Sequence, residues 1–270
     1  MAMNHPVTVT ILGCRGSIPV SGDQFARYGG ATSCVLVRTE DAMVVFDAGT
    51  GILKLTPYLR DKQTIPIFLS HCHADHIIGL PMCPAAFNRD CILDVYGATR
   101  AGMDIAHQVR TLISPPLWPI EPQHLPADIR FHEMPHAVRH GDMLIESMDG
   151  CHPGGVTVYR LSANGRRIVY MTDCTITEGN RASLLEFCQD CDLLLCDGQY
   201  SEEEWPSKTN FGHNCRTHVA QFAKDCGAKA TYLIHHDNTH TDSILDEAKK
   251  QVQTINSACA LAFEGEEIIL

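Results

Sequence analysis

The hexapeptide HCHADH at residues 71–76 constrains this chain more than any other feature, because it packs three imidazoles and one carboxylate together. It follows the apolar run at residues 65–69, so we expect it where a buried strand ends. Alternate residues of an extended segment point the same way, which lets His71 and His73 reach one metal ion. After a turn at Ala74, Asp75 and His76 can face a second ion. We therefore predict two divalent ions, Zn²⁺ with Mn²⁺ or Fe as alternatives, rather than a chance cluster of surface histidines.

Four more polar residues follow apolar segments or stand in tight turns, and they are Asp47, His152, Asp173 and His235. Functional side chains gather at such positions in sheet proteins. Taken singly, each has a structural interpretation, as a turn carboxylate, a turn histidine, a helix N-cap or a loop residue. Together with the hexapeptide they extend the predicted metal site, although the sequence leaves open whether His235 or His236 is the ligand.

Charge and cysteine content exclude several classes of protein. The net charge of −11 argues against a protein that coats nucleic acid, which needs a basic face. A small anionic substrate stays compatible, because bound cations invert the local field. We expect neither a transmembrane span nor a signal peptide. The thirteen cysteines lack a disulfide framework, so we expect reduced thiols and a cytoplasmic location. Structural, redox and metal-binding roles stay open for the C-x-x-C pair Cys188 and Cys191.

Short apolar segments bounded by Gly, Pro and Asp predict strands throughout the chain. They lie at residues 7–12, 34–37, 43–46, 65–69, 92–96, 143–147, 156–161, 167–171, 193–196 and 230–234. Helices are predicted at residues 99–112, 182–188, 216–226 and 243–252, and a proline-rich surface loop at 114–122. Both halves begin with strands and end in helices. We therefore expect one domain over residues 1–270, with two sheets packed face to face and helices outside.

The order of the polar motifs resembles the five motifs of the metallo-β-lactamase superfamily, and the likeness covers about residues 12–242. The segments LGCRGSIPV, RYGGATSCVLV, FGHNCRTH and IHHDNTHTD further resemble the ribonuclease Z-like and cyclic-phosphodiesterase-like subgroup. The resemblance implies an α/β fold, the αββα four-layer sandwich, with a binuclear metal site at one edge of the sheets.

The resemblance also implies roles for individual residues. The ligands of one ion would be His71, His73 and His152, and those of the other Asp75, His76 and His235. Asp173 would bridge the two ions, which resembles the hydrolase and phosphodiesterase branches rather than the β-lactam-hydrolysing branch. Asp47 would orient the hexapeptide through hydrogen bonds without touching a metal. Cys72 is expected to point away from the ions.

For the chemistry, the resemblance implies a hydrolase in which a metal-bound hydroxide attacks phosphorus. Asp75 would orient that hydroxide. His213 would bond a phosphoryl oxygen or protonate the leaving alkoxide, unless it only begins a helix. Its neighbour Asn214 departs from the subgroup, in which Ser or Thr is usual. Arg15 either contacts phosphate or stabilises a turn. The aromatic residues that either line the pocket or simply pack are Tyr200 and Trp205.

A small phosphodiester, such as a cyclic nucleotide or another cyclic phosphate, is the expected substrate. Residues 174–212 contain no Gly/Pro-rich arm of the kind with which ribonuclease Z grips tRNA, so tRNA 3′ processing is less favoured. Hydrolysis of an acyl bond, in a thioester or a lactone, stays open, and so does a non-catalytic metal-bound sensor. We expect no membrane partner and no stable nucleic-acid complex, and the resemblance allows a homodimer.

Overall fold

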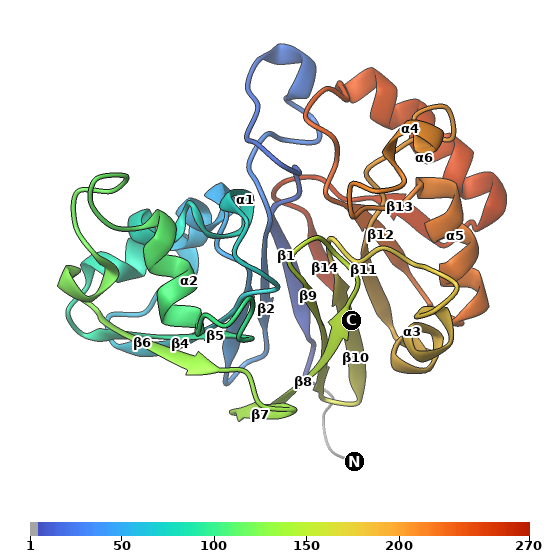
Figure 1. Cartoon of the computed structure of the whole chain (residues 1–270). Helices are drawn as coiled ribbons and strands as arrows, with labels where there is room; N and C mark the ends of the chain where they lie inside the picture. The colour runs from blue at the N-terminus through green and yellow to red at the C-terminus, as the bar shows by residue number, and fades with distance from the viewer. Residues whose placement is uncertain (1–4) are drawn as a thin grey trace.

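The computed structural model describes residues 5–270 and contains two seven-stranded mixed sheets that pack face to face (Figure 1). The first sheet has the strand order β14 (Glu267–Ile269), β1 (Thr8–Gly13), β2 (Cys34–Arg38), β3 (Met43–Phe46), β4 (Gln63–Phe68), β5 (Cys91–Gly97) and β6 (Asp128–Glu133). The second has the order β13 (Cys259–Leu261), β12 (Thr231–Ile234), β11 (Leu193–Asp197), β10 (Arg166–Met171), β9 (Val156–Ala163), β8 (Met143–Gly150) and β7 (Ala137–His140).

Helices cover the outer faces of both sheets, which confirms the predicted αββα arrangement (Figure 1). The α-helices are α1 (Ala74–Ile77), α2 (Ile105–Leu112), α3 (Arg181–Cys188), α4 (Trp205–Lys208), α5 (Arg216–Asp225) and α6 (Asp242–Ile255). The 3-10 helices are η1 (Asp23–Phe25), η2 (Thr50–Tyr58), η3 (Leu80–Met82), η4 (Pro84–Phe87) and η5 (Pro122–His124). No helix within residues 5–270 is long and apolar enough to span a bilayer.

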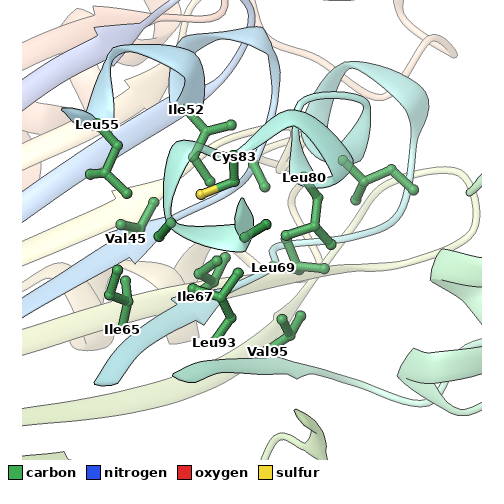
Figure 2. Close-up of a cluster of buried hydrophobic side chains, with 14 of the residues drawn as sticks. Val45, Ile52, Leu55, Ile65, Ile67, Leu69, Leu80, Cys83, Leu93 and Val95 are labelled. Atoms are coloured by element: carbon green, nitrogen blue, oxygen red, sulfur yellow. The ribbon is translucent and has the colours of Figure 1, made fainter. Parts of the chain in front are cut away.

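Three hydrophobic cores hold these layers together. Successive side chains of a strand point to opposite faces of the sheet, so one strand can contribute to two cores. In β2, Val35 and Val37 enter the core between the sheets, while Leu36 enters an outer core. Between the sheets, the ring of Phe46 lies 5.3 Å from that of Tyr170. Figure 2 shows the outer core of the first sheet, where strand side chains meet those of η2 and η3. A third core joins the second sheet to α3, α5 and α6.

Both sheets are antiparallel in one half and parallel in the other, and this positions the functional site. Strands β3 to β6 run parallel, and so do β10 to β13. Since the carboxyl ends of parallel strands meet at the same edge of a sheet, the loops after β3, β4, β10, β11 and β12 can converge.

The predicted strands agree with the structure within two residues at their ends, except that β8 continues three residues beyond its predicted end; β6, β7, β13 and β14 were not predicted. Residues of β6 and β7 are exposed or half-buried and β13 and β14 are three residues long, so these strands lack an apolar pattern. The predicted helix at 99–112 is wrong at its start. Residues 100–103 form a turn with positive φ at Ala101, and α2 begins only after Asp104, whose side chain accepts from the backbone N–H of His107.

Candidate metal centre and active site

Eight predicted site residues converge at one edge of the two sheets. The first sheet supplies Asp47 after β3 and the hexapeptide after β4. The second supplies Asp173 after β10 and His235 after β12, and His152 lies in the turn between β8 and β9. Asp47, Asp173 and His235 all have φ between 51° and 60°, a conformation that is costly for non-glycine residues and typical of functional sites.

One group of imidazoles forms the first half of the centre. The Nδ1 atom of His73 lies 2.9 Å from Nε2 of His71 and 3.1 Å from Nε2 of His152. His73 is exposed, whereas the side chain of His152 is only 2% exposed, so this half of the centre opens to solvent beside His73.

The second half of the centre is buried deeper. The Oδ2 atom of Asp75 lies 3.3 Å from Nε2 of His76 and 3.1 Å from Nε2 of His235. His236 is absent from this group, because its Nε2 donates to the carbonyl oxygen of Ala262 at 2.8 Å. The structure therefore brings His235, and not His236, into the centre.

Asp173 lies between the two halves and presents one carboxylate oxygen to each. Its Oδ2 is 3.9 Å from Nε2 of His71 and 3.7 Å from Nε2 of His152. Its Oδ1 is 3.4 Å from Nε2 of His76 and 3.2 Å from Nε2 of His235. A carboxylate that bridges two metal ions needs one oxygen directed at each group of ligands, and Asp173 has this arrangement.

The other ring nitrogens show that the centre suits cations. In four imidazoles Nδ1–H donates to an acceptor outside the centre: His71 to Ser70 Oγ, His76 to Asp47, His152 to the Gly212 carbonyl and His235 to Gln199. Their Nε2 atoms therefore face one another and the carboxylates of Asp75 and Asp173. Nε2 of His76 is buried without any hydrogen-bond partner among the described residues. Electron-pair donors gathered in this way repel one another unless a cation lies between them, so the donor set fits divalent ions.

The pKa values of the histidines differ between the two halves of the centre. Burial lowers the pKa of three imidazoles, those of His71, His73 and His152. Burial also disfavours a charged His235, but the carboxylates of Asp173 and Asp75 outweigh it and raise its pKa to about 9. The carboxylates thus attract a positive charge even without a metal, and a metal ion would displace a proton from His235.

Asp47 is fully buried and holds the hexapeptide in place through hydrogen bonds. Its Oδ1 accepts from the backbone N–H of Ser70 at 2.7 Å. Its Oδ2 accepts from Nδ1 of His76 at 2.7 Å, from Oγ of Ser70 at 2.8 Å and from the hydroxyl of Tyr170 at 2.8 Å. The sequence-based prediction missed Ser70 and Tyr170, because a serine beside the motif and a core tyrosine carry no local signal.

His213 lies beside the centre and is held by a partner that the sequence-based prediction also missed. Its Nδ1 donates to Oδ2 of Asp197 at 2.6 Å, and its ring stacks on that of His235 with centroids 4.9 Å apart. Asp197 ends strand β11 after the apolar run at residues 193–196, the same signal that marked Asp47 and Asp173. His213 therefore does not begin helix α5, whose N-cap is Cys215, and its ring is held by Asp197 instead.

Asn214 has a structural role in place of the usual hydroxyl. Its side-chain amide donates to the carbonyl of Cys174 at 2.8 Å, and its Oδ1 accepts from the backbone N–H of Ile176 at 2.9 Å. These bonds tie the segment after Asp173 to the segment that carries His213.

Arg15 stabilises loops, and the phosphate contact considered for it is excluded by its bonds. It is fully buried, and its guanidinium donates to the backbone carbonyls of Gly29, Asp237 and His240. The neighbouring Ser17 reaches the centre instead, because its backbone N–H donates to Oδ2 of Asp75 at 2.7 Å.

Three further features left open by the sequence have clear surroundings. Tyr200 is buried, and its ring stands nearly perpendicular to that of His213 at a centroid distance of 5.8 Å, whereas the Trp205 ring packs against exposed His218. In the C-x-x-C pair, Cys188 and Cys191 are both fully buried free thiols, and burial raises the pKa of both. These surroundings favour structural roles for both cysteines, since a redox thiol needs access and thiolate character.

Comparison with known proteins finds relatives of this chain in sequence and in fold. A family model described as "Beta-lactamase superfamily domain" matches residues 43–236, a range that includes every predicted site residue from Asp47 to His235. Ribonuclease Z of Treponema pallidum (strain Nichols) is 25% identical over 305 aligned positions, which cover 94% of this chain and 94% of that protein.

Solved structures share the fold at low sequence identity. The metallo-β-lactamase fold protein YhfI from Bacillus subtilis superposes with a TM-score of 0.76, over 98% of this chain and 100% of that chain, at 22% identity. The short form of human tRNase Z superposes with a TM-score of 0.70, over 97% of this chain and 98% of that chain, at 19% identity.

Proposed function

Because this chain belongs to the metallo-β-lactamase superfamily and is a metal-dependent hydrolase, we propose that it cleaves a small phosphodiester with two divalent ions, Zn²⁺ in preference to Mn²⁺ or Fe. The observation that carries the proposal is the fixed His213 imidazole beside a centre whose Asp173 carboxylate faces both ligand groups. A phosphodiesterase needs such a group next to the metals to meet a phosphoryl oxygen or the leaving alkoxide.

The residues would divide the work as follows. His71, His73 and His152 would hold one ion, Asp75, His76 and His235 the other, and Asp173 both. Two bound ions would lower the pKa of a water molecule and polarise the phosphoryl oxygen. The carboxylate of Asp75 would orient the attacking water, while Ser17 N–H fixes that carboxylate.

His213 would act on the substrate through Nε2. Because Nδ1 is committed to Asp197, Nε2 is the nitrogen that remains for a phosphoryl oxygen or for proton delivery to the leaving alkoxide. The Asp197 carboxylate keeps the ring in place, as carboxylates do for other catalytic histidines.

The second candidate substrate is tRNA, because a similar protein is named ribonuclease Z. We favour a small substrate over tRNA for three reasons. That alignment runs over 305 positions, more than the 270 residues of this chain, so the relative has segments without a counterpart here. In residues 174–212, where the sequence predicts no tRNA-gripping arm, the chain forms α3, β11 and α4 joined by turns. The net charge of −11 also opposes binding to a polyanion.

Turnover by the purified, metal-analysed protein tests the proposal. The panel contains a bis-aryl phosphate, cyclic nucleotides, a pre-tRNA, a thioester and a lactone. We expect cleavage of the small phosphodiesters that a chelator removes and Zn²⁺ or Mn²⁺ restores. His213→Gln should lower kcat by about 10²–10⁴-fold, whereas His218→Gln, an exposed histidine on α5, should leave it unchanged. Cleavage of acyl bonds alone, or of pre-tRNA alone, would contradict the proposal.

A further inference from the structure

A hollow of about 230 Å³ lies next to the centre on the side where it opens to solvent. His71 and His73 form one wall of this hollow. The other walls come from the turn before α2, from α2 itself and from the turn after His152. We name this hollow the Arg100 pocket, after the one charged residue that lines it. Its remaining walls include Arg100, Met103, Gln108, Thr111 and Pro153.

The chemistry of the Arg100 pocket is mainly apolar, and its polar groups are already bonded. The Gln108 amide donates to the carbonyls of Ala98 and Met103, both at 2.9 Å. The Arg100 guanidinium donates through Nη2 to the Asp149 carboxylate at 2.7 Å and to the Thr157 hydroxyl at 3.0 Å. Asp149 thus offsets the charge of Arg100 and holds it in one position. A guanidinium held in this way suits stacking on a planar ring better than capture of a second phosphate.

The size and position of the pocket restrict what it can take. Its volume is below the 300–1,000 Å³ usual for drug-sized ligands, so it accommodates one ring system rather than a chain of nucleotides. It borders His73 and not His213, whose ring lies against His152 and His235 instead. A phosphoryl group at the centre would therefore place its leaving arm toward His213 and its other arm toward the Arg100 pocket.

We infer that the Arg100 pocket binds the non-leaving arm of the substrate, and that this arm carries an uncharged planar ring such as a nucleobase or an aryl group. The inference rests on the proposed phosphodiesterase function and adds the class of substrate to it. The Met103 thioether and the fixed Arg100 guanidinium are the ring-binding groups.

Binding of two phosphonates to the Zn²⁺-loaded protein, measured by calorimetry, tests the inference without turnover. Phenylphosphonate should bind about 10-fold or more tightly than methylphosphonate, because only the phenyl ring buries apolar surface in the pocket. Thr111→Phe fills the pocket from an exposed helix position and should reduce this preference to about 1, with methylphosphonate affinity unchanged. Arg100→Ala should weaken the preference.

Two matched variants serve as controls. Thr254→Phe changes an exposed threonine on α6 whose hydroxyl bonds its own helix as that of Thr111 does. Arg139→Ala removes an exposed charge from β7. Both should keep the preference for phenylphosphonate. Equal affinities in the unmodified protein, or a preference that survives Thr111→Phe, would overturn the pocket assignment alone. Failure of both phosphonates to bind would overturn the phosphate chemistry of the centre and the pocket assignment together.

Discussion

Ser70 links one imidazole of the centre to the buried carboxylate of Asp47. Its hydroxyl accepts from Nδ1 of His71 at 3.0 Å and donates to Asp47 at 2.8 Å. Ser70→Ala removes both bonds and frees the His71 ring, while the bond between Asp47 and His76 stays. Loss of such an outer partner usually costs about 10–100-fold in metal affinity or activity.

The measurement for Ser70→Ala is metal affinity by competition with a chromophoric chelator. Ser183→Ala, at an exposed position of α3, is the control and should keep the affinity of the unmodified protein. An unchanged affinity in Ser70→Ala would show that the His71 ring is oriented by packing alone.

His236 makes stability depend on pH. Burial lowers its pKa to about 3, although the Ala262 carbonyl that accepts from it opposes the shift. In the unfolded chain the pKa of histidine is about 6.5, so below that pH the unfolded state binds a proton that the native state refuses. The His236 contribution is therefore complete above pH 6.5 and is lost as the pH falls toward 3.

The test compares His236→Gln with the unmodified protein by urea unfolding at pH 7.5 and 5.5, with a chelator present throughout. The unmodified protein should lose about 1 kcal/mol more stability over this range than the variant. Equal losses in the two proteins would mean that His236 can take up a proton in the folded state.

At the scale of elements, Gly212 lets the loop before α5 lie close against the turn that carries His152. It has φ +93°, and a Cβ there would lie 2.3 Å from Nδ1 of His152, the atom that donates to the Gly212 carbonyl. Gly212→Ala should therefore displace His152 and reduce metal affinity by at least about 10-fold.

Gly165 offers a matched control, because it has φ +74° in the β9–β10 turn and a Cβ would meet nothing within 4 Å. Gly165→Ala should lower stability by about 1–3 kcal/mol through backbone strain and leave metal affinity unchanged. Equal metal affinity in the two variants, measured by the same chelator competition, would contradict the role of Gly212.

At the scale of the whole molecule, the centre joins the two sheets and should couple metal binding to global stability. Asp75 and His76 come from the first sheet, and Asp173 and His235 from the second. An ion bound across them stabilises only the folded arrangement, by about 2.7 kcal/mol at 100 times its dissociation constant. Removal of metal should therefore lower Tm by several degrees.

Scanning calorimetry with and without chelator measures this effect, with metal content checked for each sample. In His76→Ala the difference in Tm should shrink, while in His218→Ala it should persist. A Tm that is the same in metal-depleted and metal-loaded samples would show that the ions do not hold the sheets together.

The sequence by itself determined the residue types of the centre, their order and most of the layered fold. Periodicity and spacing are local properties, so the alternation of β2 and the pattern of His71 and His73 can be recognised without a structure. The same reasoning failed at β6 and β7, whose exposed and half-buried residues carry no apolar pattern.

Only the tertiary structure decided which groups meet. The bond between Asp75 and His235 joins residues 160 positions apart, and the contact of Asp47 with Tyr170 spans 123. Neighbouring residues can also face opposite ways, since His235 faces Asp75 and Asp173 in the centre while His236 donates to the Ala262 carbonyl. The side chain of Arg15 likewise donates to backbone carbonyls of distant loops. These contacts depend on how the two sheets pack, because close packing and the pairing of buried polar groups involve residues far apart in the chain.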